Sequence, residues 1–178
     1  MNNTFRKNFI NITIFICLIW LSFLISKIIP INSFGIQPRT SFGLIGIFFS
    51  PFLHSSLEHI TSNTLALLVF ISLFNLVEGG KAFKKIIILI LMSGGLTWLI
   101  GRSAIHIGAS GLIFSLFGHL ISLGFFKKKI ILMLLSIILS AIYGHMIFGI
   151  LPGKAGVSWE GHLAGFVSGI ILARYYKS

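Results

Sequence analysis

The pattern of hydrophobic and polar positions divides the chain into six apolar runs separated by shorter polar or glycine-containing segments. At about 1.5 Å of rise per residue, a helix of around 20 residues crosses a hydrocarbon core of roughly 30 Å. The runs are Phe9–Ile29, Leu57–Val77, Ile86–Ile100, Ala109–Phe126, Ile130–Phe148 and Gly156–Tyr175. The third run is short, so we expect its helix to extend beyond it at one end. The pattern predicts an all-α membrane protein, with residues 1–178 forming one bundle of six transmembrane helices.

The start of the first run has the basic character of a signal peptide, because Arg6 and Lys7 precede the apolar residues. The apolar part is long, however, and no A-x-A-like cleavage site follows it. We therefore expect this segment to stay in the protein as a membrane anchor.

Composition supports a membrane protein. Hydrophobic residues make up 56% of the chain, charged residues only 10%, and the mean hydropathy is +1.01. A soluble domain of 178 residues could not bury this much apolar surface. The net charge of +11 raises the question of nucleic-acid binding, but the basic residues flank apolar runs rather than cluster on a polar face. The expected surroundings are a lipid bilayer and no nucleic acid, and the single Cys17 excludes an internal disulfide.

The distribution of basic residues predicts the orientation in the membrane. With the N-terminus inside, ten of the 14 Lys and Arg residues fall on the inner side. The four on the outer side are Lys27, Arg39, Arg102 and Lys154. This imbalance favours two cytoplasmic termini. The second, fourth and sixth helices then run inward from the outer surface, so a site at their starts faces outward. The small size of the chain favours the inner membrane of a bacterium, and an organellar membrane is the alternative.

A candidate nucleophile lies at the start of the fourth run, in the sequence Gly108-Ala109-Ser110-Gly111. In the first turn of a helix, unpaired backbone N–H groups and the positive end of the dipole can stabilise a developing oxyanion. Gly and Ser are also common packing residues between membrane helices. Ser110 alone therefore leaves both interpretations open.

A serine nucleophile needs a general base, and histidine is the usual one. His162 is favoured because Gly161, Gly165 and Gly169 give two overlapping G-x-x-x-G spacings, which allow close helix packing. The fourth run offers a matching surface with Gly111, Ser115 and Gly118. His162 lies six residues after Gly156, so we expect it roughly 9 Å below the outer end of its helix.

The other histidines are weaker candidates for the base. His119 lies nine residues beyond Ser110 on the same helix and cannot reach its hydroxyl. His106 and His145 lie near the expected outer end and remain possible, although both also fit structural or interfacial roles.

No acidic residue is suited to orient the base. The chain contains no Asp, and its three carboxylates are Glu58, Glu78 and Glu160. Glu78 is expected on the cytoplasmic side, and Glu160 projects from a different side of any helix it shares with His162. We therefore expect a Ser-His dyad, in which Phe114, one turn after Ser110, stacks on the imidazole.

Hydrogen-bond donors for an oxyanion are found on the second run. His59 and Asn63 are four residues apart and share one helix face. Together with the Ser110 backbone N–H they could form an oxyanion hole, although the same pair could be a polar contact between helices. A metal site is not expected, because the chain has no H-E-x-x-H motif and no Cys cluster. No cofactor is expected either.

Three motifs in order resemble the rhomboid family of intramembrane serine proteases. They are His54-x4-His59-x3-Asn63, Gly108-Ala109-Ser110-Gly111 and Gly161-His162-x2-Gly165. The likeness extends to Gly35-Ile36-Gln37-Pro38-Arg39 and to Ser158-Trp159-Glu160-Gly161-His162. The resemblance implies a six-helix rhomboid fold, a water-filled active site that opens outward, and peptide-bond hydrolysis near the membrane surface.

The resemblance also implies residue roles. Ser110 would be the nucleophile and His162 the base, while His59, Asn63 and the Ser110 amide bind the oxyanion. Further implied positions are the supporting His54 and the packing residues Gly108, Gly111, Gly161 and Gly165. The resemblance also implies that the fifth helix and the loop Gly149–Val157 act as a lateral gate and cap. Phe114 stands where some relatives have tyrosine, and Arg39 lacks the tryptophan that precedes it in many relatives.

The expected function is that of an intramembrane endopeptidase that cleaves single-pass membrane proteins. One alternative is a noncatalytic rhomboid-like protein that binds or escorts transmembrane clients. Another is a small transporter with a proton relay through His59 and His162. The sequence indicates neither the substrate nor the oligomeric state.

Overall fold

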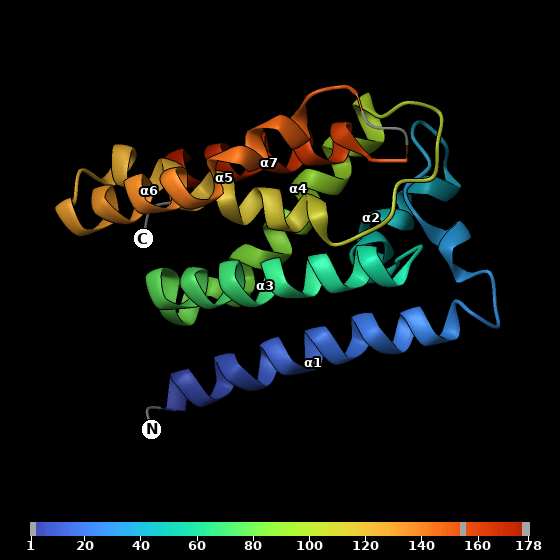
Figure 1. The fold of residues 1–178 in the computed structure, drawn as a ribbon, viewed down its shortest axis with the longest axis horizontal. Helices are drawn as coiled ribbons and strands as arrows, with labels where there is room; N and C mark the ends of the chain where they lie inside the picture. Colours follow the sequence, from blue (N-terminus) through green and yellow to red (C-terminus); the bar gives the residue numbers. More distant parts are fainter. Residues whose placement is uncertain (1–2, 154–155, 176–178) are drawn as a thin grey trace.

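A computed structural model describes residues 3–153 and 156–175, and this part of the chain forms a bundle of six long helices (Figure 1). The long helices are α1 (Asn3–Ile25), α3 (Leu57–Glu78), α4 (Ala82–Ile100), α5 (Ser110–Lys127), α6 (Ile130–Tyr143) and α7 (Trp159–Tyr175). The predicted all-α fold of six long helices is confirmed. Three stretches are long and apolar enough to cross a membrane: Leu57–Ile100, which contains α3 and α4, Ser110–Lys127 and Ile130–Ile150.

The connections contain short helical turns. The longest one, between α1 and α3, includes the short helix α2 (Gly46–Phe49). The 3-10 turns are η1 (Ile31–Phe34), η2 (Phe42–Leu44), η3 (Ser50–Phe52), η4 (Gly79–Lys81) and η5 (Gly144–Ile150). The long connection between α1 and α3 is thus an ordered layer over one end of the bundle.

Two predicted boundaries at the first and third runs need correction. α1 covers Asn3–Ile25 rather than Phe9–Ile29, because a helix can continue through polar residues at its start. It ends before Pro30, whose ring disfavours a helical conformation of the preceding residue. α4 begins at Ala82, four residues before the apolar run, as expected for a run that was too short.

Two further boundaries lie in the last third of the chain. α6 ends at Tyr143, and the chain continues as η5 rather than as α-helix to Phe148. α7 begins at Trp159 rather than Gly156, because Gly156 has a positive φ of 80° and the Ser158 hydroxyl accepts a hydrogen bond from the Gly161 N–H at 3.2 Å. A hydropathy pattern does not indicate a helix cap, so the start of α7 was predicted three residues too early.

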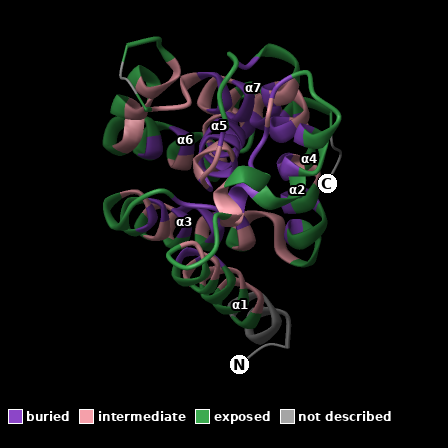
Figure 2. Cartoon of the chain, turned by 90° about the vertical axis from the view of Figure 1, so that its right-hand side faces the viewer, coloured by how far each residue is buried: buried purple, intermediate pink, exposed green. Residues whose placement is uncertain are grey.

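α5 is the central helix of the bundle. Every residue from Leu112 to Leu120 is buried, and in the end-on view α5 is surrounded by other helices (Figure 2). α1 lies at the edge against α3, where the Trp20 indole N–H donates to the Thr64 hydroxyl at 3.2 Å. Residues at the start of α5 are therefore within reach of several helices, whereas those of α1 are not.

The helices that carry the candidate residues run in the same direction. The N-terminal ends of α3, α5 and α7 lie together at the right of Figure 1, and α1 begins and α7 ends at the opposite side. The expected parallel course of these three helices is confirmed. Lys154 and Lys177, which contribute to the predicted orientation, lie outside the described residues.

A buried polar group joins three helices at the end of the bundle away from the candidate site. Glu78 near the end of α3 accepts a hydrogen bond from the Lys85 ammonium on α4 through one oxygen. Its other oxygen lies 2.6 Å from His119 Nε2 on α5. The three side chains are almost completely buried. His119 therefore belongs to a structural contact far along α5 from Ser110.

We expect Glu78→Gln to destabilise the protein strongly, because it removes the carboxylate charge that faces Lys85 and His119. Removing one partner of a buried ion pair typically costs about 3–5 kcal/mol. Thermal unfolding in detergent measures the loss. The control is Glu58→Gln in the exposed first turn of α3, where only a dipole interaction of about 0.3–1 kcal/mol is at stake. Equal losses in both variants would contradict this role.

Candidate active site

The segment before Ser110 is fixed by the long connection between α1 and α3. Ile36 and His106 form an antiparallel bridge, with N···O distances of 2.9 and 2.8 Å. Two residues later, the Gly108 N–H donates to the Ser50 carbonyl at 2.8 Å. Gly108 has φ of 113°, a conformation that side chains rarely adopt. These contacts set the position at which α5 begins.

Ser110 is the first residue of α5, so the predicted place in the first turn is confirmed. Its backbone N–H belongs to the group that has no partner within a helix. Among the described residues, the Ser110 hydroxyl makes no hydrogen bond. The nucleophile candidate is thus half-buried at a helix N-terminus, with its hydroxyl available.

α5 and α7 approach so closely that their glycines meet backbone atoms. A Cβ at Gly165 would collide with the Gly111 carbonyl oxygen and lie 3.2 Å from the Phe114 Cβ. A Cβ at Gly169 would collide with the Ser115 carbonyl oxygen in the same way. The expected packing of the two glycine-containing faces is confirmed, and only glycine permits it at these positions.

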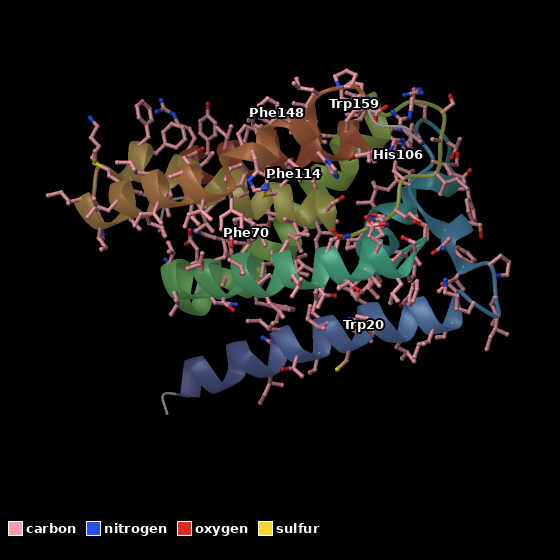
Figure 3. The ribbon with its side chains drawn as sticks, in the orientation of Figure 1. Trp20, Phe70, His106, Phe114, Phe148 and Trp159 are labelled. Carbon is pink, nitrogen blue, oxygen red and sulfur yellow. The ribbon has the colours of Figure 1, made fainter. Side chains whose placement is uncertain are left out.

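His162 lies in the first turn of α7, three residues after Trp159. Its depth is therefore about 4.5 Å along the helix rather than the expected 9 Å, which brings it closer to the level of Ser110. The imidazole stacks on the Phe114 ring with a centroid distance of 4.2 Å and an interplanar angle of 9°. Phe114 lies between α5 and α7 in Figure 3. The predicted aromatic stacking is confirmed.

The hydrogen bond of His162 defines its tautomer. Nδ1 lies 2.9 Å from the Gly149 carbonyl oxygen in η5. A carbonyl oxygen can only accept, so Nδ1 carries the proton and donates it. The neutral ring therefore has its lone pair on Nε2, as a general base requires. No hydrogen bond joins His162 to Ser110 within the described residues.

His54, His59 and Asn63 form a connected group beside Gly108. His54 Nδ1 lies 3.4 Å from the Phe52 carbonyl oxygen, so Nε2 accepts from the Asn63 amide at 2.9 Å. The His54 and His59 rings pack edge to face at 4.8 Å. A Cβ at Gly108 would lie 2.6 Å from His59 Nε2 and 3.4 Å from Asn63 Nδ2. Both donors thus converge on the backbone that leads into Ser110.

The remaining histidines are not brought to Ser110. His106 Nδ1 lies 2.6 Å from the Ser158 hydroxyl, and the side chain is buried. Figure 3 shows His106 among the connecting segments at the right-hand end of the bundle. His119 contacts Glu78, and His145 is exposed in η5. Among the residues described, no group of three His, Cys, Asp or Glu side chains is placed to hold a metal ion.

Comparison with known proteins places the chain in a family. The model of the Rhomboid domain matches residues 41–178. The chain belongs to the rhomboid family. It is thus an integral membrane protein of a family of intramembrane proteases, as the resemblance of its motifs indicated.

Several mycobacterial proteins are similar to this rhomboid protein over most of its length. An uncharacterized protein of Mycobacterium tuberculosis (strain ATCC 25618 / H37Rv) is 37% identical over 173 residues, which cover 89% of this chain and 71% of that protein. An uncharacterized protein of Mycobacterium leprae (strain TN) is 33% identical over 175 residues, with coverages of 92% and 69%.

Three contacts of this rhomboid site were missed in the sequence. The partner of His162 Nδ1 is the Gly149 carbonyl, and a backbone group leaves no side-chain signal. Ser158 caps α7, and a serine directly before a helical segment is a common N-cap that could have indicated this start. Arg39 donates to the carbonyls of Leu99 and Gly101 at 3.1 and 2.7 Å, and so caps the end of α4 without a tryptophan neighbour.

We expect Gly165→Ala to push α5 and α7 apart and to destabilise this rhomboid protein by about 1–3 kcal/mol, the usual cost of overpacking. The matched control is Gly95→Ala in α4, where no atom lies within 4 Å of the new Cβ. That change should stabilise the helix by roughly 0.5–1 kcal/mol. Thermal unfolding of both variants in detergent tests the contrast. A Gly165→Ala protein as stable as Gly95→Ala would refute the close contact.

We expect a pH dependence of stability from His54, which lies outside the membrane-spanning segments. Burial, aided by nearby His59 and opposed by the Phe52 carbonyl, lowers the pKa of His54 to about 4. The unfolded chain takes up the proton near its ordinary pKa of 6.5. Stability is therefore full above pH 6.5 and falls as the pH drops toward 4, by up to about 3 kcal/mol.

Unfolding at pH 7 and pH 5 measures this loss. The control His54→Gln keeps an acceptor for the Asn63 amide but does not titrate, so it should lose less stability on acidification. The same loss in wild type and His54→Gln would show that another group is responsible.

Proposed function

We propose that this rhomboid protein is an intramembrane serine endopeptidase that cleaves transmembrane proteins through a dyad of Ser110 and His162. The observation that carries the proposal is the state of His162. Its Nδ1–H donates to Gly149 and its face stacks on Phe114, so that Nε2 is the unprotonated nitrogen. A neutral imidazole held in this tautomer is the form that accepts a proton from a serine.

The packing of α5 on α7 supports a short distance between the Ser110 and His162 side chains. The Gly161 carbonyl oxygen would lie 3.6 Å from a Cβ at Gly111. Ser110 and His162 are the immediate chain neighbours of these two glycines. In proteases without a bound substrate, catalytic hydrogen bonds are often long and shorten only in the complex. The unpaired Ser110 hydroxyl is compatible with this behaviour.

The reaction proceeds in two steps. Ser110 Oγ forms a bond to the carbonyl carbon of the scissile peptide while its proton passes to His162 Nε2. The C–N bond then breaks, and the amine product leaves with that proton, so that an acyl-enzyme remains. A water molecule gives its proton to the same nitrogen and attacks the ester. The released Ser110 oxygen takes the proton back, and the carboxylic acid product departs.

The oxyanion formed in each step needs donors from several elements. The Ser110 backbone N–H lies at the N-terminus of α5, where the dipole adds to its effect. The Asn63 amide uses one hydrogen for His54 Nε2 and keeps a second. His59 Nε2 faces the backbone at Gly108. Loss of one such donor typically costs 10²–10³ in rate, or roughly 3–4 kcal/mol.

The proposed setting is a bacterial inner membrane with both termini in the cytoplasm. The site then opens to the outer side, where water has access and where single-pass substrates leave the bilayer. The charge asymmetry of the sequence supports this orientation. η5 is the described part of the proposed cap over His162, because the Gly149 carbonyl in η5 contacts the imidazole. Residues 154 and 155 of the expected cap lie outside the described residues.

The test is cleavage of a detergent-solubilised single-pass membrane protein, together with labelling by a fluorophosphonate. We expect wild type to cleave and to label at Ser110, while Ser110→Ala abolishes both. His162→Ala should lower cleavage by at least about 10³-fold. Undiminished cleavage by either variant would refute the dyad.

The same experiment separates the alternative functions. A noncatalytic client-binding protein would bind the substrate in both wild type and Ser110→Ala and release no product. A proton-coupled transporter would give pH-dependent flux without labelling. Covalent labelling of Ser110 would contradict both alternatives.

A further inference from the structure

Four side chains outside the proposed dyad form a connected polar group between the segment before α5 and the start of α7. They are Arg102 and His106 on one side and Ser158 and Glu160 on the other; we call them the polar clamp. His106 and Glu160 are 4% and 3% exposed. Burying polar groups costs free energy unless they form hydrogen bonds. The hydrogen bonds among these four residues, beside the proposed dyad, therefore lower the cost of burying His106 and Glu160.

The hydrogen bonds of His106 join the two sides. Its Nε2 lies 3.1 Å from the Arg102 carbonyl oxygen, which can only accept, so Nε2 carries the proton. Nδ1 therefore accepts from the Ser158 hydroxyl at 2.6 Å. The same hydroxyl accepts from the Gly161 N–H at 3.2 Å. The Ser158 hydroxyl thus donates to His106 and accepts from the backbone of α7.

A second set of contacts closes the clamp. The Arg102 guanidinium lies 3.4 Å from Glu160 Oε1 and donates to the Val157 carbonyl at 2.6 Å. The Arg102 backbone N–H also donates to Glu160 Oε1 at 3.3 Å. The start of α7 is therefore held at Val157, Ser158 and Glu160 by the segment that leads to Ser110.

The polar clamp links the backbone that leads to Ser110 with the turn that carries His162. The backbone of His106 pairs with Ile36, and Gly108, two residues before Ser110, bonds to Ser50. On the other side, the His162 N–H donates to the Ser158 carbonyl at 3.1 Å. A shift of Ser158 would therefore move the turn that carries His162, while Ser110 stays in place.

We propose that His106 and Ser158 are positioning residues for the peptidase reaction, which hold His162 at the level of Ser110. Neither touches the reacting atoms. The inference rests on the proposed function and deepens it. Misplacement of a reacting group by about 1 Å can cost 10²-fold in rate, so the loss of one clamp bond should lower kcat more than it changes KM.

The experiment measures kcat and KM for cleavage of a solubilised single-pass substrate by Ser158→Ala and His106→Leu. We expect kcat to fall by roughly 10–100-fold and KM to stay within about threefold. Two conservative variants should restore kcat to within about threefold of wild type. Ser158→Thr keeps the hydroxyl, and His106→Asn keeps an acceptor toward it.

Two further measurements separate positioning from general stability. The double variant Ser158→Ala/His106→Leu should have a kcat no lower than about threefold below the worse single variant, because both changes remove the same bond. The control Ser136→Ala removes the hydrogen bond from Ser136 on α6 to the Leu120 carbonyl on α5, which lies ten residues beyond Ser110. It should lower the unfolding temperature and leave kcat per labelled Ser110 unchanged.

The outcomes are distinct. Unchanged kcat per labelled site in Ser158→Ala, or failure of Ser158→Thr to restore it, overturns the positioning role while the peptidase function stands. A wild-type protein that neither cleaves nor labels overturns the peptidase function and the positioning role with it.

Discussion

The close approach of α5 and α7 is the constraint on which the site depends. Gly165 and Gly169 meet carbonyl oxygens of α5, so there is no room for a side chain at these two positions of α7. In a bilayer, association of helices draws on such packing, because lipid is as apolar as the helix surface. The same contact brings the first turns of both helices together. The packing that stabilises the bundle is therefore also what brings Ser110 and His162 to neighbouring positions.

The end of the bundle that carries Ser110 and His162 holds several buried polar contacts that a hydropathy pattern does not predict. The connection between α1 and α3 forms hydrogen bonds with His106, with Gly108 and with the end of α4. It therefore ties the segment before α5 to the end of α4. Buried polar groups away from water need such partners. At the other end, one carboxylate, Glu78, serves the same purpose for three helices. The apolar middle of the bundle can then consist largely of packing contacts around α5.

The sequence predicted the elements of the fold and the helices that carry the site, because apolar runs and glycine spacing report on membrane helices directly. It placed α5 to within one residue at each end. It missed the start of α7 by three residues, because Gly156 and Val157 continue the apolar pattern although the backbone is not yet helical. The hydrogen-bond partners of His106 and His162 were also missed. They lie far away in sequence or on the backbone, where composition carries no information.

The absence of aspartate from the chain has a physical counterpart in the structure. In the proposed reaction, a carboxylate beside His162 would stabilise the imidazolium, but a second ionised group inside the membrane is costly to desolvate. The Gly149 carbonyl selects the same tautomer without a charge, and the Phe114 ring fixes the plane of the imidazole. In the proposed reaction, the aromatic face would also stabilise the positive charge of the imidazolium. A neutral acceptor and a stacked ring thus replace the acidic partner, and precise helix packing becomes correspondingly more important.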